Sequence, residues 1–358
     1  MKKRNIFSSF ALIVFIFLLF FVNGGAEAYE LTARSLGMGG AFSAIADDLE
    51  AILYNPASIA NAGVLGLGVN TGISTYNLEY LEELLELYED DEYGDIKELA
   101  GGIKEKAGFN SNVFVGARLN SIGLAYRMKQ EHSINPIGDN YFSEKLSEGI
   151  LSYGNQLLDP PFELGALYYG INLRYINIER VTYDLVDNLV GNAKGGFFSV
   201  DLGTLAKVTD NLRIACVVEN ALFTNPDLKG ELKKYNLITG DEWSYQVINP
   251  SYSSHKDIKA KVRLGAALRI PIIDLTLAAD LDNFLTAQEK QVLHLGLEKN
   301  LLLDALSIRL GKAKGEELNL NTFGLGLNLT GFNLDLALGK NRLGNREIIG
   351  LLSASMDF

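Results

Sequence analysis

The feature that most constrains the fold is a two-residue alternation of apolar and small or polar side chains after residue 63. In "LGLGVNTGI", Leu65, Leu67 and Val69 fall on one face, while glycine and asparagine fall on the other. The segments "VRLGAALRI" and "FGLGLNL" alternate in the same way. Because successive side chains of an extended chain point to opposite faces, these segments are predicted strands with one apolar face.

We predict fourteen such strands, and the even number returns the chain end to the side on which the first strand began. They lie at residues 65–73, 113–119, 122–128, 164–169, 171–183, 197–206, 212–220, 262–270, 272–281, 293–298, 306–312, 323–329, 332–339 and 348–358.

The connections between these strands alternate between short and long. Short ones are predicted at residues 120–121, near Gly170, at 208–211, at Pro271, and at 300–305 and 330–331. Long ones are predicted at residues 75–112, 129–163, 184–196, 221–260, 282–292, 313–320 and 340–347. Outer-membrane β-barrels keep short turns on the periplasmic side and longer loops outside. The sequence therefore predicts an all-β fold, a transmembrane antiparallel barrel of about fourteen strands over residues 64–358. Hydrocarbon cannot hydrogen-bond an open sheet edge, so the last strand is expected to pair with the first.

Both chain ends support an outer-membrane location. Lys2, Lys3 and Arg4 precede an apolar run from residue 10 to 22, and Ala26-Glu27-Ala28 follows. This is the pattern of a secretory signal peptide over residues 1–28. The chain ends in "LLSASMDF", and a terminal aromatic such as Phe358 is the expected insertion signal for the barrel assembly machinery. We therefore expect a protein of the cell outer membrane, in contact with its lipid.

Composition excludes several functions. The formal charge is −12. Removing the signal peptide would take away a net charge of +2 and leave about −14, which makes nucleic acid an unsuitable partner. Cys216 is the sole cysteine, and His132, His255 and His294 lie far apart, so no disulfide or zinc site is predicted. The sequence contains neither a nucleophile-elbow motif nor a P-loop. We predict no catalytic residues, no metal site, no cofactor and no enzyme activity.

The polar faces of the predicted strands would line the lumen. Their charged residues are Arg118, Arg127, Arg174, Asp201, Arg213, Arg263, Arg269, Asp280, Glu298, Arg309 and Asp335. Charges of both signs could pair across the interior and brace the wall, and a ligand role is the alternative. Aromatic residues near strand ends are predicted to form girdles at the membrane surface; they are Tyr76, Tyr183, Phe197, Phe198, Phe284 and Phe332.

One long connection breaks the strand pattern. Between residues 77 and 107, Leu78, Leu81, Leu85 and Tyr88 recur at helical spacing, which predicts a helix pair within an external loop. Its many acids suggest calcium, but they lack the ligand spacing of an EF-hand loop, so a solvated acidic face is the preferred interpretation.

The start of the mature chain, "ARSLGMGGAFSAIADDLEAILYNPASIA", does not fit a nucleotide-binding motif. The third glycine of G-x-G-x-x-G is missing after "GMGG", and no strongly apolar strand precedes it. The stretch resembles the N-terminal region of the FadL-type outer-membrane transport family, including its PorV-like and TraF-like relatives. Members typically begin with "ARxxGMGGAFxAxADDxxAxxxNPA". The resemblance is specific over residues 33–60 and looser in the C-terminal half.

The resemblance implies that residues 29–63 fold into the lumen as a hatch. The residues that match the motif and would form this hatch are Gly37, Gly39, Gly40, Asp47, Asp48, Asn55, Pro56 and Ala57. Glycines suit close backbone approach inside a barrel. A short helix over residues 47–54, ending before Pro56, is also expected. A loose periplasmic tail is the alternative.

Two functions follow from the resemblance. The first is passive, hatch-gated transport of hydrophobic small molecules such as long-chain fatty acids. The second is a PorV-like or TraF-like barrel that acts as a partner of secretion or conjugation machinery, docking through the acidic loop at 77–107. A diffusion porin is disfavoured because a folded hatch would block a water-filled channel.

Overall fold

The computed structural model describes residues 32–76, 94, 96–98, 103, 107–135, 140–158, 165–239, 242–255, 258–284, 291–316, 318–343 and 347–358. The predicted signal peptide at 1–28 and most of the helix pair at 77–107 lie outside these residues, so both stay predictions.

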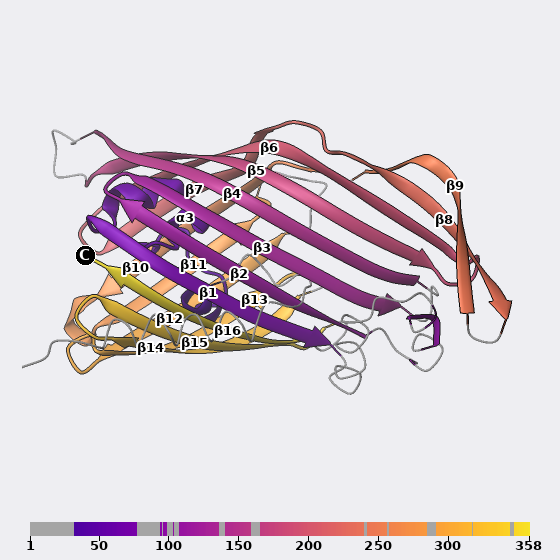
Figure 1. Cartoon of the computed structure of the whole chain (residues 1–358). Coiled ribbons are helices and arrows are strands. Elements are labelled where there is room, and N and C mark those ends of the chain that lie inside the picture. Colours follow the sequence, from indigo (N-terminus) through magenta and orange to yellow (C-terminus); the bar gives the residue numbers. More distant parts are fainter. Residues whose placement is uncertain are drawn as a thin grey trace, which may run out of the picture.

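The described chain consists mainly of antiparallel strands (Figure 1). Their bounds are β1 Leu65–Tyr76, β2 Ala107–Leu119, β3 Ile122–Asn135, β4 Asn140–Leu158, β5 Leu167–Asp184, β6 Leu189–Lys207, β7 Leu212–Phe223, β8 Asp227–Thr239, β9 Glu242–His255, β10 Lys261–Ile270, β11 Leu275–Asp282, β12 Val292–Leu301, β13 Leu306–Lys314, β14 Asn319–Asn328, β15 Phe332–Asn341 and β16 Ile348–Asp357.

Fourteen of these strands close into a barrel. The order runs β5-β4-β3-β2-β1-β16-β15-β14-β13-β12-β11-β10-β7-β6, and β6 also pairs with β5. At the seam between the chain ends, Leu65 N donates to Phe358 O at 2.9 Å and Phe358 N donates to Leu65 O at 2.8 Å. Because every barrel strand has two neighbours, the closure satisfies the backbone groups that an open edge would leave exposed. Strands β8 and β9 form a hairpin, in which β8 pairs with the N-terminal part of β6, residues 189–194.

The predicted fold class and strand number are confirmed, but several strands were assigned wrongly. The predicted break near Gly170 does not exist, because β5 passes through it without interruption. Strand β4 lies inside the predicted long loop at 129–163, and β8 and β9 lie inside the predicted loop at 221–260. The predicted long connection at 184–196 is a turn at residues 185–188. The predicted number of barrel strands was right because β5 was counted as two strands while β4 was missed.

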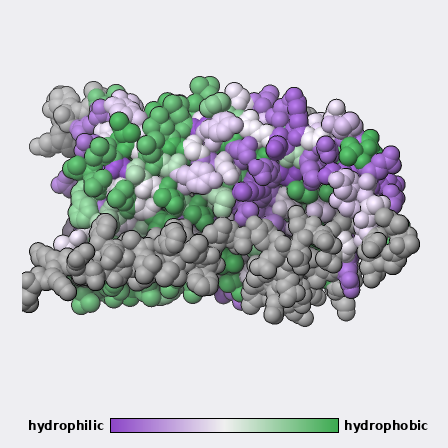
Figure 2. Space-filling view, in the orientation of Figure 1, coloured by the Kyte–Doolittle hydropathy of each residue, from purple (hydrophilic) through white to green (hydrophobic). Residues whose placement is uncertain are grey.

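The missed strands carry little apolar alternation because they extend beyond the apolar band of the wall. Strands β4 and β6 have 19 residues each, whereas β11 has 8. In Figure 2, green hydrophobic side chains gather over the half that contains the C-terminus, and purple ones dominate toward β8 and β9. An apolar outer band on a closed barrel indicates a protein of the outer membrane. Within the described ranges, no helix is long and apolar enough to cross a bilayer.

Residues 32–63, here called the N-terminal segment, lie inside the barrel at the short-turn end (Figure 1). The segment contains α2 Ala33–Gly37, α3 Ala51–Tyr54 and the 3-10 helix η1 Pro56–Asn61. Helix α2 contacts β13 to β16, and η1 contacts β4 to β6 on the opposite wall. The expected helix over 47–54 is therefore shorter than predicted, since only its last turn forms.

The inner wall matches this segment with small residues. An added Cβ at Gly170 would lie 2.2 Å from the Pro56 carbonyl carbon, and one at Gly203 would lie 2.3 Å from Asn55 Oδ1. The largest apolar core joins the N-terminal segment to inward side chains such as Phe114 and Leu205. The core of this barrel is thus formed by the segment that fills it.

Candidate functional site

The glycines of the N-terminal segment allow close backbone contact with the wall. Gly37 packs against Gly324, where an added Cβ would lie 3.1 Å from the neighbouring Cα. Gly39 and Gly40 have φ of +66° and +88°, which side chains other than hydrogen disfavour. His294 Nδ1 donates to the Gly39 carbonyl oxygen at 2.7 Å. These glycines thus position a turn against β12 to β14.

The Asn-Pro-Ala sequence fixes the other end of the segment. Asn55 Nδ2 donates to the carbonyl oxygens of Ser43 and Thr204 at 3.0 and 3.1 Å, and its Oδ1 accepts from Ala57 N at 3.1 Å. Pro56 occupies the first turn of η1, where a missing N–H costs nothing. Asn55 therefore ties the segment both to itself and to β6.

The paired acids of the segment meet an arginine from the same segment. Arg34 Nη1 lies 2.8 Å from Asp47 and 2.7 Å from Asp48, and Arg34 Nε lies 3.3 Å from Glu298 on β12. Burial raises the pKa of Asp48 to about 6, although Arg34 opposes the shift. Burial and the nearby Asp48 charge raise the pKa of Glu50 well above its usual range. The segment is thus held by largely buried ion pairs within itself and to β12.

The predicted lumenal charges point inward, and each arginine among them pairs with a carboxylate. Arg309 bridges Glu298 at 2.6 Å and Asp335 at 2.5 Å, and Arg118 lies 3.2 Å from Asp357. Asp280 accepts from the backbone N–H groups of Phe42 and Ser43 at 3.0 and 2.9 Å.

The remaining predicted arginines pair as well. Arg263 binds Asp282 at 2.5 Å and Glu219 at 3.2 Å. Arg213 lies 3.9 Å from Asp47, and Arg269 lies 3.9 Å from Asp274 at a turn. These contacts brace the wall and attach the N-terminal segment to it.

A second charged network lies farther from the short-turn end, on the inner wall formed by β3 to β6. Arg127 contacts Glu148 at 2.5 Å, Arg174 also contacts Glu148, and Arg174 lies 3.2 Å from Asp201. Glu148 was missed by the sequence analysis because β4 was missed. Two arginines and two carboxylates leave this layer without excess charge.

Next to this network, on the side away from the short-turn end, lies a buried apolar cluster, which we call the lumenal patch. Its members are Ile176, Ile178, Ala193, Phe197 and Leu228, with Leu146, Tyr252 and Ile258 packed against it. Ile176 and Ile178 share a face of β5 with Arg174, which places the patch on the lumenal side. Arg180 and Glu144, 2.6 Å apart, lie beyond it toward the external loops.

The girdle prediction was wrong for Phe197, which belongs to this patch, and for Tyr183, which is buried in another cluster. Tyr76 is 6% exposed and is also buried. Phe198 and Phe284, by contrast, are 62% and 45% exposed. A shift of one residue along a strand exchanges lumen and lipid, so Phe197 and Phe198 face opposite sides.

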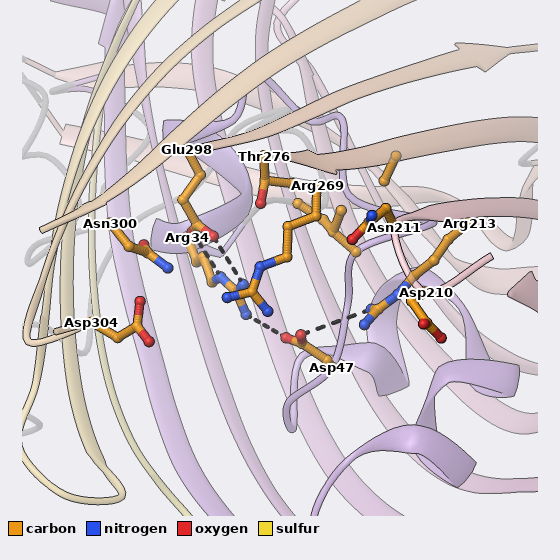
Figure 3. A pocket seen from close by; sticks show the side chains of 12 residues that line it. Arg34, Asp47, Asp210, Asn211, Arg213, Arg269, Thr276, Glu298, Asn300 and Asp304 are labelled. Atoms are coloured by element: carbon orange, nitrogen blue, oxygen red, sulfur yellow. Dashed lines mark hydrogen bonds and ion pairs between the residues drawn. The ribbon is translucent and has the colours of Figure 1, made fainter. Parts of the chain in front are cut away.

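A polar cavity of ≈ 230 Å³ opens under the N-terminal segment at the short-turn end (Figure 3). Arg34, Asp47 and Glu298 meet in it, Arg269 extends to the side of Arg34, Arg213 approaches Asp47 from the other side, and Asp304 points in from a turn. The cavity lining is dominated by charged side chains, so this chamber suits water better than a hydrocarbon. The lumenal patch and the polar cavity lie on opposite sides of the segment along the barrel.

Among the described residues, no group of three or more histidine, cysteine, aspartate or glutamate side chains could hold a metal ion. Cys216 is a free thiol on β7.

Comparison with known proteins identifies the fold. No protein-family model matches the chain, and a sequence search of curated proteins finds no match. Among solved structures, the toluene transporter TbuX of Ralstonia pickettii is 11% identical with a TM-score of 0.61, covering 92% of this chain and 98% of that one. The monoaromatic hydrocarbon channel CymD is 12% identical, with a TM-score of 0.62 and coverage of 92% and 97%. A FadL homologue of Pseudomonas aeruginosa is 10% identical, with a TM-score of 0.58 and coverage of 94% and 100%.

TbuX is a transporter and CymD is a channel, and this chain shares the fold of all three neighbours over nearly its whole length. The resemblance inferred from residues 33–60 is thereby confirmed for the fold. The looser likeness to PorV-like and TraF-like barrels stays a prediction.

Proposed function

We propose that this protein transports hydrophobic small molecules passively across the outer membrane, with the N-terminal segment acting as a gated hatch. The observation that carries the proposal is the lumenal patch, a buried apolar cluster that lies next to the charged network of Arg127, Glu148 and Arg174. Burying apolar surface contributes about 25 cal/mol per Å², which suits weak, reversible binding of a small hydrocarbon.

Charge pairing favours uncharged molecules over carboxylates. Arg127, Arg174 and Arg180, which flank the patch, each contact a carboxylate already. A fatty-acid anion would have to displace one of these carboxylates, at the cost of leaving that carboxylate without its partner. Long-chain fatty acids are therefore the second ligand class, and a neutral monoaromatic molecule is the first.

Gating follows from how tightly the segment fills the barrel. Phe42, Ile52 and Ala57 have no exposed surface, so the segment seals the lumen in this conformation. Passage then requires the segment to shift. The Arg34 network is the suited latch, because its partner Asp47 is 41% exposed at the polar cavity and this contact can exchange with water at small cost.

The test is uptake by cells that lack other hydrocarbon channels and have an intact outer membrane. Initial uptake of labelled toluene and of labelled oleate is measured with and without the protein. The proposal expects toluene uptake to rise several-fold above background and oleate uptake to rise less. Equal toluene uptake with and without the protein would remove the proposal, and a rise for oleate alone would reverse the order of ligands.

An interaction barrel is the second candidate because of the β8–β9 hairpin. The hairpin projects past the wall, and within the described residues β9 pairs with β8 alone. The acidic loop at 77–107 would serve the same role. Photo-crosslinking from Tyr245 on β9 separates the two ideas, since capture of one stable protein neighbour in cells favours the interaction barrel and its absence favours the transporter.

A further inference from the structure

Two neighbouring short turns carry large aliphatic side chains at their tips. Ile272 and Ile273, between β10 and β11, are 94% and 49% exposed, and Leu302 and Leu303, between β12 and β13, are 76% and 102% exposed. The turns touch, because Asn300 N donates to Asp274 O at 3.1 Å and Lys299 Nζ reaches Ile273 O. Short turns normally carry glycine, asparagine or other polar residues.

The backbone of the second turn makes leucine still less expected. Leu302, Leu303 and Asp304 have φ of +54°, +57° and +66°. This left-handed region is unfavourable for a bulky side chain and is usually occupied by glycine or asparagine. Asp304 points into the polar cavity (Figure 3), while the side chains of the two leucines are exposed. The turn therefore combines a polar side toward the cavity with an exposed apolar tip.

Two of the strands beside these turns, β11 and β13, offer less apolar height than the layer that the wall must cross. At the usual rise and tilt, each residue adds about 2.5 Å of height, so the 8 residues of β11 reach about 20 Å. On β13 the outward apolar run is Leu306, Ile308 and Leu310, only about 10 Å, before the exposed Lys312. The apolar band of outer-membrane barrels is about 25 Å tall.

We propose that Ile272, Ile273, Leu302 and Leu303 form a lipid anchor that inserts among the acyl chains of the periplasm-facing leaflet. The turn tips supply the apolar height that β11 and β13 lack. The outward Leu268, Leu277 and Leu310 are exposed by 42%, 39% and 52%, and they make the anchor continuous with the lipid-facing band. Lys299 Nζ donates to the Ile273 carbonyl oxygen, which gives this backbone acceptor at the turn a hydrogen-bond partner.

Thiol accessibility in nanodiscs tests the anchor. In a Cys216→Ala background, Leu303→Cys is compared with Asp210→Cys, which lies in the exposed turn between β6 and β7 at the same end of the barrel. Both proteins are reacted with a charged, membrane-impermeant maleimide. Burying an aliphatic side chain in lipid favours the buried state by roughly tenfold or more, so labelling at 303 should be at least about tenfold slower.

Folding of each variant is checked by heat-dependent migration on a gel. Equal labelling rates at 303 and 210 would overturn the anchor, whether the tip then faces free water or a periplasmic protein absent from the nanodisc. As a second measurement, a nitroxide at position 303 should collide more with oxygen than with a water-soluble nickel chelate. The reverse preference would also overturn the proposal.

Discussion

Single residues decide which parts of this barrel could be recognised from sequence. Gly39 and Gly40 need positive φ, and Asn55 needs its amide to tie η1 to β6, so their identities are fixed by geometry and stand out as a motif. Glu148 and Phe197 carry no such local signature. Their roles come from register across strands, where one position separates Phe197 in the lumen from Phe198 on the outside.

Asp48 makes the docking of the N-terminal segment depend on pH. Its carboxyl pKa rises from 3.8 to about 6 in the folded protein because of burial, so the folded state binds the proton more tightly. Stability of the docked segment should therefore fall as pH rises from about 4 to about 6, by at most about 3 kcal/mol, and stay level above that. Glu50 acts in the same direction, since its pKa is also raised.

Amide hydrogen exchange of the segment, corrected for the intrinsic rate, measures this slope. Asp48→Asn should remove much of the slope between pH 4 and 6. Protection that increases with pH in the wild type, or an unchanged slope in the variant, would show that Asp48 does not control docking.

At the scale of elements, the strands are divided between two tasks. Strands β1, β10 and β14 place apolar residues on their lipid-facing side, which produces the alternation from which they were predicted. Strands β8 and β9 lie beyond the apolar band, and β4 extends past it, so their faces there are polar or mixed and the alternation fades. The tight turns were easier to predict from sequence than the strands that they join. The exception is Gly170, which allows close contact with Pro56 and does not form a turn.

Packing of η1 against β5 gives a direct prediction. Gly170→Ala would place a Cβ 2.2 Å from the Pro56 carbonyl carbon and 2.3 Å from Ala57 N, both backbone atoms that cannot yield alone. Overpacking of this kind costs about 1–3 kcal/mol, so exchange of the segment amides should be about tenfold to a hundredfold faster. Gly149→Ala, on neighbouring β4 with nothing within 4 Å, is the matched control and should change nothing. Equal exchange in both variants would show that this contact does not hold the segment.

The lumenal patch can be tested on one strand. Ile178→Asn puts a polar group into the apolar surface, and weaker burial of about 1.4 kcal/mol corresponds to roughly tenfold weaker binding. Toluene uptake at low concentration should fall accordingly. Glu179→Gln, one position along β5 and facing outward, should leave uptake unchanged. Loss in both variants, or in neither, would mean that the patch does not bind the transported molecule.

At the scale of the whole molecule, the closed barrel and the segment that fills its lumen form one structure. The lumen of the described barrel is closed by residues 32–63, whose apolar side chains form the largest core with the wall. Sequence pattern predicts the closed barrel, because lipid leaves no alternative to a paired edge. The sequence pattern could not predict the polar cavity at the short-turn end or the apolar lumenal patch, because both are assembled from segments far apart in the sequence. The barrel therefore holds a buried apolar patch on one side of the N-terminal segment and a polar cavity on the other.

The most direct test of the central claim fixes the plug to the wall. An added Cβ at Gly265 would lie 2.0 Å from Ser43 Oγ, so Ser43→Cys with Gly265→Cys, in a Cys216→Ala background, joins the segment to β10. Toluene uptake is then measured in cells before and after reduction of the disulfide, with each single-cysteine variant as control. We predict uptake at background level when the bond is formed and recovery on reduction. Full uptake with the disulfide intact would contradict a gating N-terminal segment.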